Sequence, residues 1–398
     1  MYKQLIIYLL LIVLMVFIPD IQIGGKYLRL EDIMIIILVL SIVLNINSNR
    51  ERLIFPQHKT FIFIIVLVLI SIFWNQLIKK DTQVNNTVLM KEMLRMMKYY
   101  LLIFICLNIK LKRKEDINYI LIIISIVICT VGIMQRFNIL GVSELIKQIY
   151  RPEDIHHNLV STYYLYSNSA RIYTTFNNPN QYGSFLLILL ISITSLKLKQ
   201  KIENKIFVTT LILIIVNLIL TQSRSNIIAT AIWVFYFYIY LLRNNKMRVK
   251  YFVSVLIATI LLVTVSELYN LLNFYDRSFD LYINRMNAID NIVKIISTNP
   301  VFGNSVLHYD ANMTAWDSEI LIIISYTGLL GLAYYIYKII NKIKFKLKGL
   351  TDEEFISNSL IIILPIIAIT KGAIFSIKFF PLYIILYYIS FKQKDNND

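Results

Sequence analysis

Long runs of isoleucine, leucine, valine and phenylalanine recur along the whole chain and are separated by shorter polar segments. A run of roughly 17 to 25 apolar residues is the length at which a helix crosses the ~30 Å hydrocarbon layer of a membrane. The chain is 57 % hydrophobic and only 16 % charged, which departs from the composition of soluble domains. These features predict an all-α, polytopic integral membrane protein.

About twelve runs approach the spanning length. They lie near residues 4–19, 31–47, 60–77, 94–109, 117–134, 182–197, 205–221, 225–242, 250–266, 318–340, 356–371 and 376–391. We treat residues 1–398 as a single transmembrane domain. The first run has no small-residue cleavage site before Asp20, so we expect a retained helix and not a removed signal peptide.

Basic residues give the orientation. They concentrate in alternate short connections, at residues 50–59, 110–114, 197–205, 243–250 and 342–348. Cytoplasmic loops carry an excess of Lys and Arg, so we predict a multi-pass protein of the cell membrane with both termini in the cytoplasm. The net charge of +16 is then mainly an orientation signal, and we expect no nucleic-acid partner.

This orientation leaves two long loops outside the cell, at residues 135–181 and 267–317. Functional residues concentrate on loops that a rigid scaffold holds, and long loops without a role are uncommon in compact proteins. We therefore expect the chemistry at the extracytoplasmic face.

The sequence lacks the residue patterns that disulfides, metal sites and phosphate-binding loops require. Cys106 and Cys129 both fall inside predicted helices, where they suit core packing better than a disulfide. The sequence has no Gly-rich phosphate loop, and its histidines have no metal-ligand spacing. They are His58, His156, His157 and His308. We expect no metal site and no cofactor.

The first polar motif, RIYTTFNNPNQYG, covers Arg171 to Gly183 and precedes the run at 182–197. Asn178 and Pro179 are residues that begin helices. A helix N-terminus with an arginine nearby makes an anion site, because its backbone N–H groups carry partial positive charge. The motif predicts either such a site or a simple helix cap beside an interfacial arginine.

The second motif, TQSRSN, is a tight outer turn from Thr221 to Asn226. It places Arg224 at a second outward-facing helix N-terminus, with Ser223 or Ser225 as the cap. An interfacial anchor is the alternative. Positive-inside bias disfavours a lone arginine on this side, so we interpret Arg224 as functional.

The third motif begins with Arg285, in RMNAIDNIVKIIS at 285–297, whose apolar residues share one face and predict an amphipathic helix on the membrane surface. STNPVFGNS follows, and an acidic segment with Asp317 and Glu319 leads into the run at 318–340. We expect Arg171, Arg224 and Arg285 to converge on one site.

These motifs resemble the O-antigen polymerase and O-antigen ligase superfamily of the Wzy type. The resemblance rests on Arg171 with FNNPNQYG, on TQSR, and on Arg285 followed by NPVFGNS and SYTGLLG, and it covers roughly residues 165–335. It implies a glycosyltransferase that needs no metal and joins undecaprenyl-pyrophosphate-linked oligosaccharide repeat units at the outer face of the membrane. The product is then a capsule, an exopolysaccharide or an O-antigen.

The resemblance implies catalytic roles for Arg171, Arg224 and Arg285 on the pyrophosphate, because guanidinium binds phosphate oxygens bidentately and stays charged. Ligases of the superfamily usually have a His-Asn pair where this chain has Asp317, Ser318 and Glu319. Asp317 or Glu319 is therefore the candidate general base, unless both only stabilise the start of a helix.

The substrate itself is expected to touch a further set of polar residues. They are Asn178, Asn180, Gln181, Ser223, Arg277 and His308. Beyond the lipid-linked oligosaccharide and the lipid bilayer, a chain-length regulator and a flippase of the same pathway are candidate partners. Lys98, inside the fourth run, is interpreted as lying near an interior turn of the helix or as snorkelling, with a contact to lipid phosphate as a further alternative.

Two alternatives stay open at this point. A ligase would hand finished glycan to a different acceptor. A lipid-linked oligosaccharide flippase would also have about twelve spans, but transporters place ionisable residues and helix breaks near the bilayer midplane, whereas the polar motifs here lie at one predicted face. The sugars, their linkage and the oligomeric state do not follow from the sequence.

Overall fold

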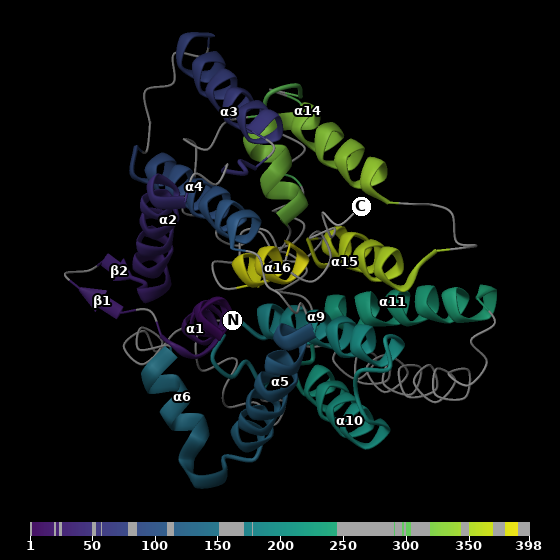
Figure 1. The fold of residues 1–398 in the computed structure, drawn as a ribbon. Coiled ribbons are helices and arrows are strands. Elements are labelled where there is room, and N and C mark those ends of the chain that lie inside the picture. Colours follow the sequence, from purple (N-terminus) through teal and green to yellow (C-terminus); the bar gives the residue numbers. More distant parts are fainter. Residues whose placement is uncertain are drawn as a thin grey trace.

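A computed structural model describes residues 2–19, 21–23, 26–49, 53–56, 58–78, 86–109, 115–150, 171–176, 178–244, 290, 297, 300–303, 319–343, 350–368 and 379–388. Most of these residues are helical (Figure 1). The helices outside the first predicted loop are α1 Tyr2–Phe17, α2 Leu30–Asn49, α3 His58–Ile78, α4 Asn86–Asn108, α5 Glu115–Arg136, α9 Pro179–Leu198, α10 Asn204–Leu220, α11 Arg224–Arg243, α14 Glu319–Lys342, α15 Asp352–Ala368 and α16 Phe379–Tyr387.

Each predicted apolar run overlaps one of these helices, except the run at 250–266, which lies outside the described residues. Among the described residues, three helices are long and apolar enough to cross a membrane: Tyr119–Arg136, Pro179–Leu198 and Ser225–Arg243. Leu5–Phe17, Ile65–Trp74 and Asn204–Leu220 are shorter apolar helices. The count of about twelve spans stays a prediction.

Two short elements depart from the predicted pattern. Strands β1 (Ile21–Ile23) and β2 (Lys26–Leu28) pair antiparallel, with Ile21 opposite Leu28, so the chain is not strictly all-α. The first outer loop, predicted at 135–181, begins with helical structure: α5 continues to Arg136, and a 3₁₀ turn, η1 (Ile139–Gly141), leads into α6 (Val142–Tyr150).

Helix α6 forms because Ile146 and Tyr150 recur at helical spacing and dock on the rest of the protein. Ile146 is buried, and the Tyr150 hydroxyl donates a hydrogen bond to the carbonyl oxygen of Phe17 at the end of α1. Burial raises the pKa of Tyr150 above its ordinary value of 10.0, so this donor keeps its proton at neutral pH. The start of the segment predicted as the first outer loop is therefore fixed to α1.

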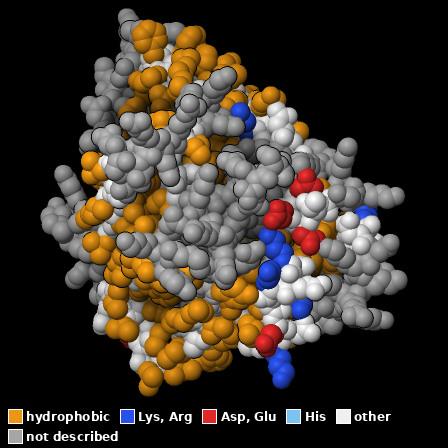
Figure 2. Space-filling view, viewed as in Figure 1, with side chains coloured by type: hydrophobic (Ala, Val, Ile, Leu, Met, Phe, Trp, Pro, Cys, Tyr) orange, Lys and Arg blue, Asp and Glu red, His pale blue; other side chains and the backbone are white. Residues whose placement is uncertain are grey.

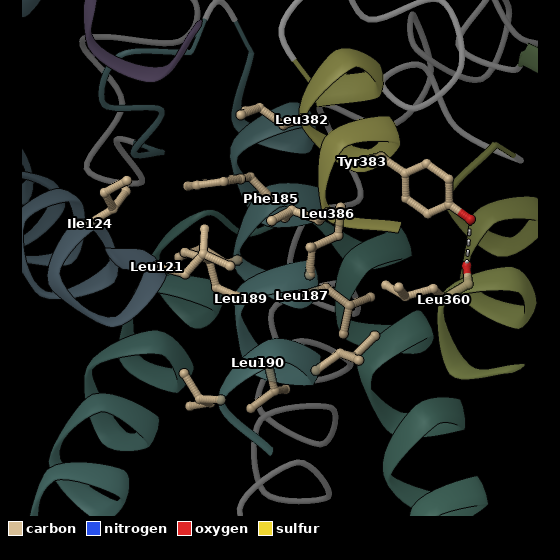
Figure 3. Packing of buried hydrophobic residues seen from close by; sticks show 14 of the residues in the cluster. Leu121, Ile124, Phe185, Leu187, Leu189, Leu190, Leu360, Leu382, Tyr383 and Leu386 are labelled. Carbon is tan, nitrogen blue, oxygen red and sulfur yellow. Dashed lines mark hydrogen bonds between the residues drawn. The ribbon is translucent and has the colours of Figure 1, made fainter. Parts of the chain in front are cut away.

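Helix α9 lies at the centre of the core and packs against α5, α10, α11, α15 and α16 (Figure 1). Every residue from Tyr182 to Leu196 is buried, as expected for a helix that is apolar all round. Figure 3 shows α9 leucines between side chains of α5, such as Leu121, and of α16, such as Leu386. The first polar motif, which precedes α9, is thus attached to the most buried helix described.

The outward-facing side chains are themselves largely apolar. Figure 2 shows hydrophobic side chains over much of one face, with the charged ones gathered toward one side. Large apolar side chains on several helices are more than half exposed; examples are Ile37, Leu44, Phe73, Ile123 and Phe235. Exposed apolar surface on this scale marks contact with a membrane or a partner.

Helix α9 ends where its basic residues begin. Gln200 adopts the left-handed conformation (φ 55°), and the Lys201 N–H donates to the Leu196 carbonyl oxygen at 2.9 Å. This is the hydrogen bond of a Schellman-type helix end. The turn reverses the chain into α10, so that α10 ends and α11 begins beside the start of α9.

Candidate functional site

The start of α9 has the predicted cap. Asn178 has extended backbone angles and occupies the N-cap position, its side-chain oxygen accepts a hydrogen bond from the Asn180 N–H at 2.7 Å, and Pro179 is the first helical residue. A proline at that position costs nothing, because its missing N–H would have no partner inside the helix. The prediction that these residues begin a helix is confirmed.

The second motif is the turn between α10 and α11. Ser223 is at the N-cap position of α11, as predicted, but its side chain makes no capping hydrogen bond. The Ser223 hydroxyl instead accepts a hydrogen bond from the Asn226 side-chain amide at 2.7 Å. Helix α11 begins at Arg224, whose side chain lies outside what the structure describes.

Arg171 connects the first motif to the second. Its Nε donates to the Thr221 carbonyl oxygen at 2.8 Å, and its Nη2 donates to the Asn180 side-chain oxygen at 2.9 Å. The neighbouring Ile172 N–H donates to the Leu220 carbonyl oxygen at 3.2 Å. The guanidinium is therefore held between the first turn of α9 and the turn that opens α11.

Asn226 holds these two helix starts together, and sequence reasoning missed it. Its side-chain nitrogen donates to the Asn180 carbonyl oxygen at 2.8 Å, its side-chain oxygen accepts from the Ser184 hydroxyl at 3.0 Å, and the side chain is fully buried. A Cβ on Gly183 would lie 2.5 Å from that nitrogen. The adjacent small residues Gly183 and Ser184 were the available signal, because small side chains let apolar helices approach closely.

The site has the electrostatics of an anion-binding site. Two helix N-termini meet beside one guanidinium, and each N-terminus contributes partial positive charge and N–H donors. The first turns of α9 and α11, both described, contain no acidic residue that would oppose this charge. Asn178, Asn180 and Gln181 are partly exposed there.

The third motif is described only in part. Arg285, Arg277, His308 and Asp317 lie outside the described residues, and Glu319 is described only as the first residue of α14. Of the predicted amphipathic helix at 285–297, the structure describes two positions, 290 and 297, both helical and exposed. The convergence of Arg285 on the site stays a prediction.

The NPVFGNS and SYTGLLG segments do contact each other. The Leu329 N–H donates to the Pro300 carbonyl oxygen at 2.9 Å, and the Leu330 N–H donates to the Val301 carbonyl oxygen at 3.4 Å. Gly328 has φ 65° and ψ −165°, which interrupts α14. The prediction of a continuous helix over 318–340 is therefore wrong at Gly328. The N–H groups of Leu329 and Leu330 bind the 300–303 turn instead of carbonyl groups of the preceding helical turn.

Gly328 is required at this junction. A Cβ there would lie 2.1 Å from the Val301 carbonyl oxygen, and its backbone angles belong to a region that only glycine enters readily. Helix α3 covers the same turn, with the Trp74 and Phe302 rings 5.5 Å apart. Two stretches that carried the resemblance are thus one packed unit.

Lys98 makes ion pairs inside the protein. Its Nζ lies 3.2 Å from the Glu31 carboxylate and 2.6 Å from the Asp32 carboxylate, and Arg29 lies 3.7 Å from Glu31. The Lys98 side chain is largely buried. Of the three alternatives for Lys98, the structure contradicts snorkelling and a lipid-phosphate contact, because the ammonium group binds carboxylates of the protein and links α4 to α2.

Comparison with known proteins bears on the second half of the chain. Residues 209–336 match the model of a protein family described as O-Antigen ligase. The match contains the second motif, Arg285 and the Gly328 junction, and begins after Arg171. No curated protein and no solved structure matches the chain. The match supports the O-antigen ligase and polymerase superfamily and, with the apolar helices, an integral membrane protein.

Proposed function

We propose that this chain, which matches the O-antigen ligase family over residues 209–336, is a polysaccharide polymerase at the outer face of the cytoplasmic membrane. Its donor is an oligosaccharide on undecaprenyl pyrophosphate, and its acceptor is a sugar hydroxyl of a second lipid-linked repeat unit. The observation that carries the proposal is the placement of Arg171 between the N-termini of α9 and α11. A pyrophosphate fits a site of that charge.

The reaction forms one glycosidic bond and breaks one sugar–phosphate bond. The acceptor hydroxyl oxygen attacks the anomeric carbon of the donor, the electron pair of the old C–O bond leaves with the pyrophosphate, and the hydroxyl proton passes to a base. Negative charge grows on the leaving group during this step. Preorganised donors at that position lower the barrier by several kcal/mol in enzymes of known mechanism.

Arg171 is suited to stabilise this charge because its position is set before substrate arrives. Two of its N–H groups are directed at Thr221 and Asn180, so the side chain needs little reorganisation. Arg224 and Arg285 are assigned to the same pyrophosphate. Asn178, Asn180, Gln181, Ser223, Arg277 and His308 are assigned to the substrate.

The base is assigned to Asp317 or Glu319. Both precede or open α14, and a carboxylate removed from water becomes a better base. The presence of acidic residues where ligases of the superfamily usually have a His-Asn pair favours a polymerase over a ligase. The proposed mechanism takes no metal and no cofactor.

The test is deletion of the coding gene followed by analysis of the surface glycan. We expect the deletion strain to lose long chains and to retain single repeat units on the lipid carrier at the outer face. Restoring the wild-type chain should restore the ladder of lengths on a sizing gel. Repeat units trapped facing the cytoplasm would indicate a flippase, and long chains left on the carrier would indicate a ligase.

A further inference from the structure

Gln135, at the end of α5, holds the segment that carries Arg171. Its side-chain oxygen accepts two hydrogen bonds from consecutive backbone N–H groups, those of Tyr173 at 3.1 Å and Thr174 at 2.9 Å. Gln135 is buried. Neither the predicted motifs nor the family match includes α5, so this contact adds a helix to the site.

The held segment is strained. Thr174 has φ 49°, a left-handed conformation that is unusual for a β-branched residue. Such strain persists only where surrounding contacts over-determine it, and it concentrates at functional sites. The two bonds to Gln135 are among those contacts, together with the turn in which the Phe176 N–H donates to the Tyr173 carbonyl oxygen at 2.9 Å.

The other side of the same segment is bound to α10. Ile172 donates to Leu220, and Arg171 donates to Thr221. Helices α5 and α10 are also bound to each other. The Asn217 side chain of α10 donates to the Cys129 carbonyl oxygen of α5 at 3.1 Å and occupies the space that a Cβ on Gly132 would need. Residues 171–174 are therefore fixed between the ends of two packed helices.

We propose that Gln135 is a positioning residue for the proposed polymerase reaction: by holding the Tyr173 and Thr174 amides, it fixes the guanidinium of Arg171 where the donor pyrophosphate binds. The inference rests on the proposed function. Gln135 touches no substrate in this role. Losing it lets residues 171–174 move away from α5, and a displacement of about 1 Å in a catalytic group costs up to a hundredfold in rate.

The variants distinguish the loss of the hydrogen-bond acceptor from a change in side-chain volume. Gln135→Leu removes the acceptor at similar size. Gln135→Asn keeps an amide but is one methylene shorter, so it serves if the leucine variant fails to fold. Gln135→Glu keeps an oxygen acceptor in either protonation state. Gln148→Leu, at an exposed position of α6, is the matched control.

The first measurement is amide hydrogen exchange of the purified full-length chain in nanodiscs, which does not depend on activity. We expect exchange of the Tyr173 and Thr174 amides to become about tenfold faster in Gln135→Leu and Gln135→Asn, because these two N–H groups lose their acceptor. Gln135→Glu and Gln148→Leu should match the wild type. Unchanged exchange in the leucine and asparagine variants would overturn the proposal.

The second measurement is polymerisation kinetics with lipid-linked repeat units extracted from the deletion strain. At equal amounts of folded protein, we expect kcat/KM for this donor to fall about ten- to hundredfold in Gln135→Leu and Gln135→Asn and to return to the wild-type value in Gln135→Glu. An unchanged kcat/KM in the leucine and asparagine variants would refute the positioning role. If the wild type makes no polymer, the proposed function fails, whereas the exchange data still report what Gln135 holds.

Discussion

The side-chain nitrogen of Asn226 donates a hydrogen bond to the carbonyl oxygen of Asn180 at 2.8 Å. This contact joins the first turn of α11 to the first turn of α9, two helix starts that are separated in sequence by the whole of α10. Asn180 also accepts from Arg171. The position of the guanidinium therefore depends on how the two helices meet.

Replacing Asn226 by aspartate should destabilise the protein. The change keeps the shape but removes both N–H donors and sets a carboxylate against the Asn180 carbonyl oxygen. A buried acceptor left without its donor costs about 1–3 kcal/mol, so the thermal midpoint of the purified protein should fall. Asn204→Asp, at an exposed position, is the control, and an equal midpoint for the two variants would contradict the role of Asn226.

Replacing Arg171, Arg224 or Arg285 by alanine should abolish long-chain product while protein levels in the membrane stay normal. Lysine should restore only part of the activity, because a point charge does not reproduce the planar fork of arginine. The glycan is sized on gels after complementation of the deletion strain. Arg243→Ala, at the exposed far end of α11, should leave chain length unchanged; normal polymer from Arg224→Ala would refute the shared site.

Gly328→Ala should damage the junction between α14 and the 300–303 turn. The new methyl group would lie 2.1 Å from the Val301 carbonyl oxygen, so the turn must move away or α14 must straighten. Gly141→Ala is a matched control, because Gly141 also has positive φ (69°) but its added Cβ would have nothing nearer than 3.9 Å. We expect a clearly larger loss of thermal stability for Gly328→Ala, and equal losses would show that the close approach is unimportant.

Conservative changes at Asp317 and Glu319 distinguish a base from a helix cap. Asp317→Asn keeps an acceptor for backbone N–H groups, so a capping role predicts at most about 1 kcal/mol of lost stability and normal polymer. A general base predicts a 10²- to 10⁴-fold lower rate in folded protein. We expect at least one of Asp317→Asn and Glu319→Gln to stop chain growth. Full activity of the double variant would leave catalysis to the arginines and to leaving-group departure.

Cysteine labelling of intact cells tests the orientation. Gln148 on α6 and Gln200 after α9 are both exposed, and the predicted topology places them on opposite sides of the membrane. A membrane-impermeant thiol reagent should label Gln148→Cys and should label Gln200→Cys only after the cells are opened. Cys106 and Cys129 are buried, so the background should be low. Labelling of Gln200→Cys from outside would reverse the topology and the site assignment.

Local sequence features predicted what local interactions determine. The apolar runs gave the helices, and Asn178 with Pro179 gave the start of α9, because caps and hydrophobic length act within a few residues. The contact of Arg171 with Thr221 agrees with the expectation that the first two motifs meet, since both helix starts were predicted at the same face. Helix α6 was missed although Val142, Leu145, Ile146 and Ile149 recur at helical spacing, because nine residues are too few to span a membrane and the whole stretch at 135–181 was interpreted as a loop.

Contacts between distant segments were not predictable in this way. Gln135 and Asn226 bind groups that are 38 to 46 residues away in the chain, and a single buried amide leaves no periodic trace. The break at Gly328 also depends on contacts between distant segments, because the N–H groups of Leu329 and Leu330 bind the 300–303 turn. The glycine alone did not indicate a break, since glycine inside an apolar run is often tolerated in a helix.

The ion pairs of Lys98 with Glu31 and Asp32 also bear on how the chain is assembled during synthesis. A buried charge without a partner carries a large desolvation cost, and the Lys98 side chain is largely buried. Helix α2 carries both carboxylates in its first turn and precedes α4 in the chain, so it is synthesised first. Lys98 therefore finds both of its partners already made when α4 joins the protein.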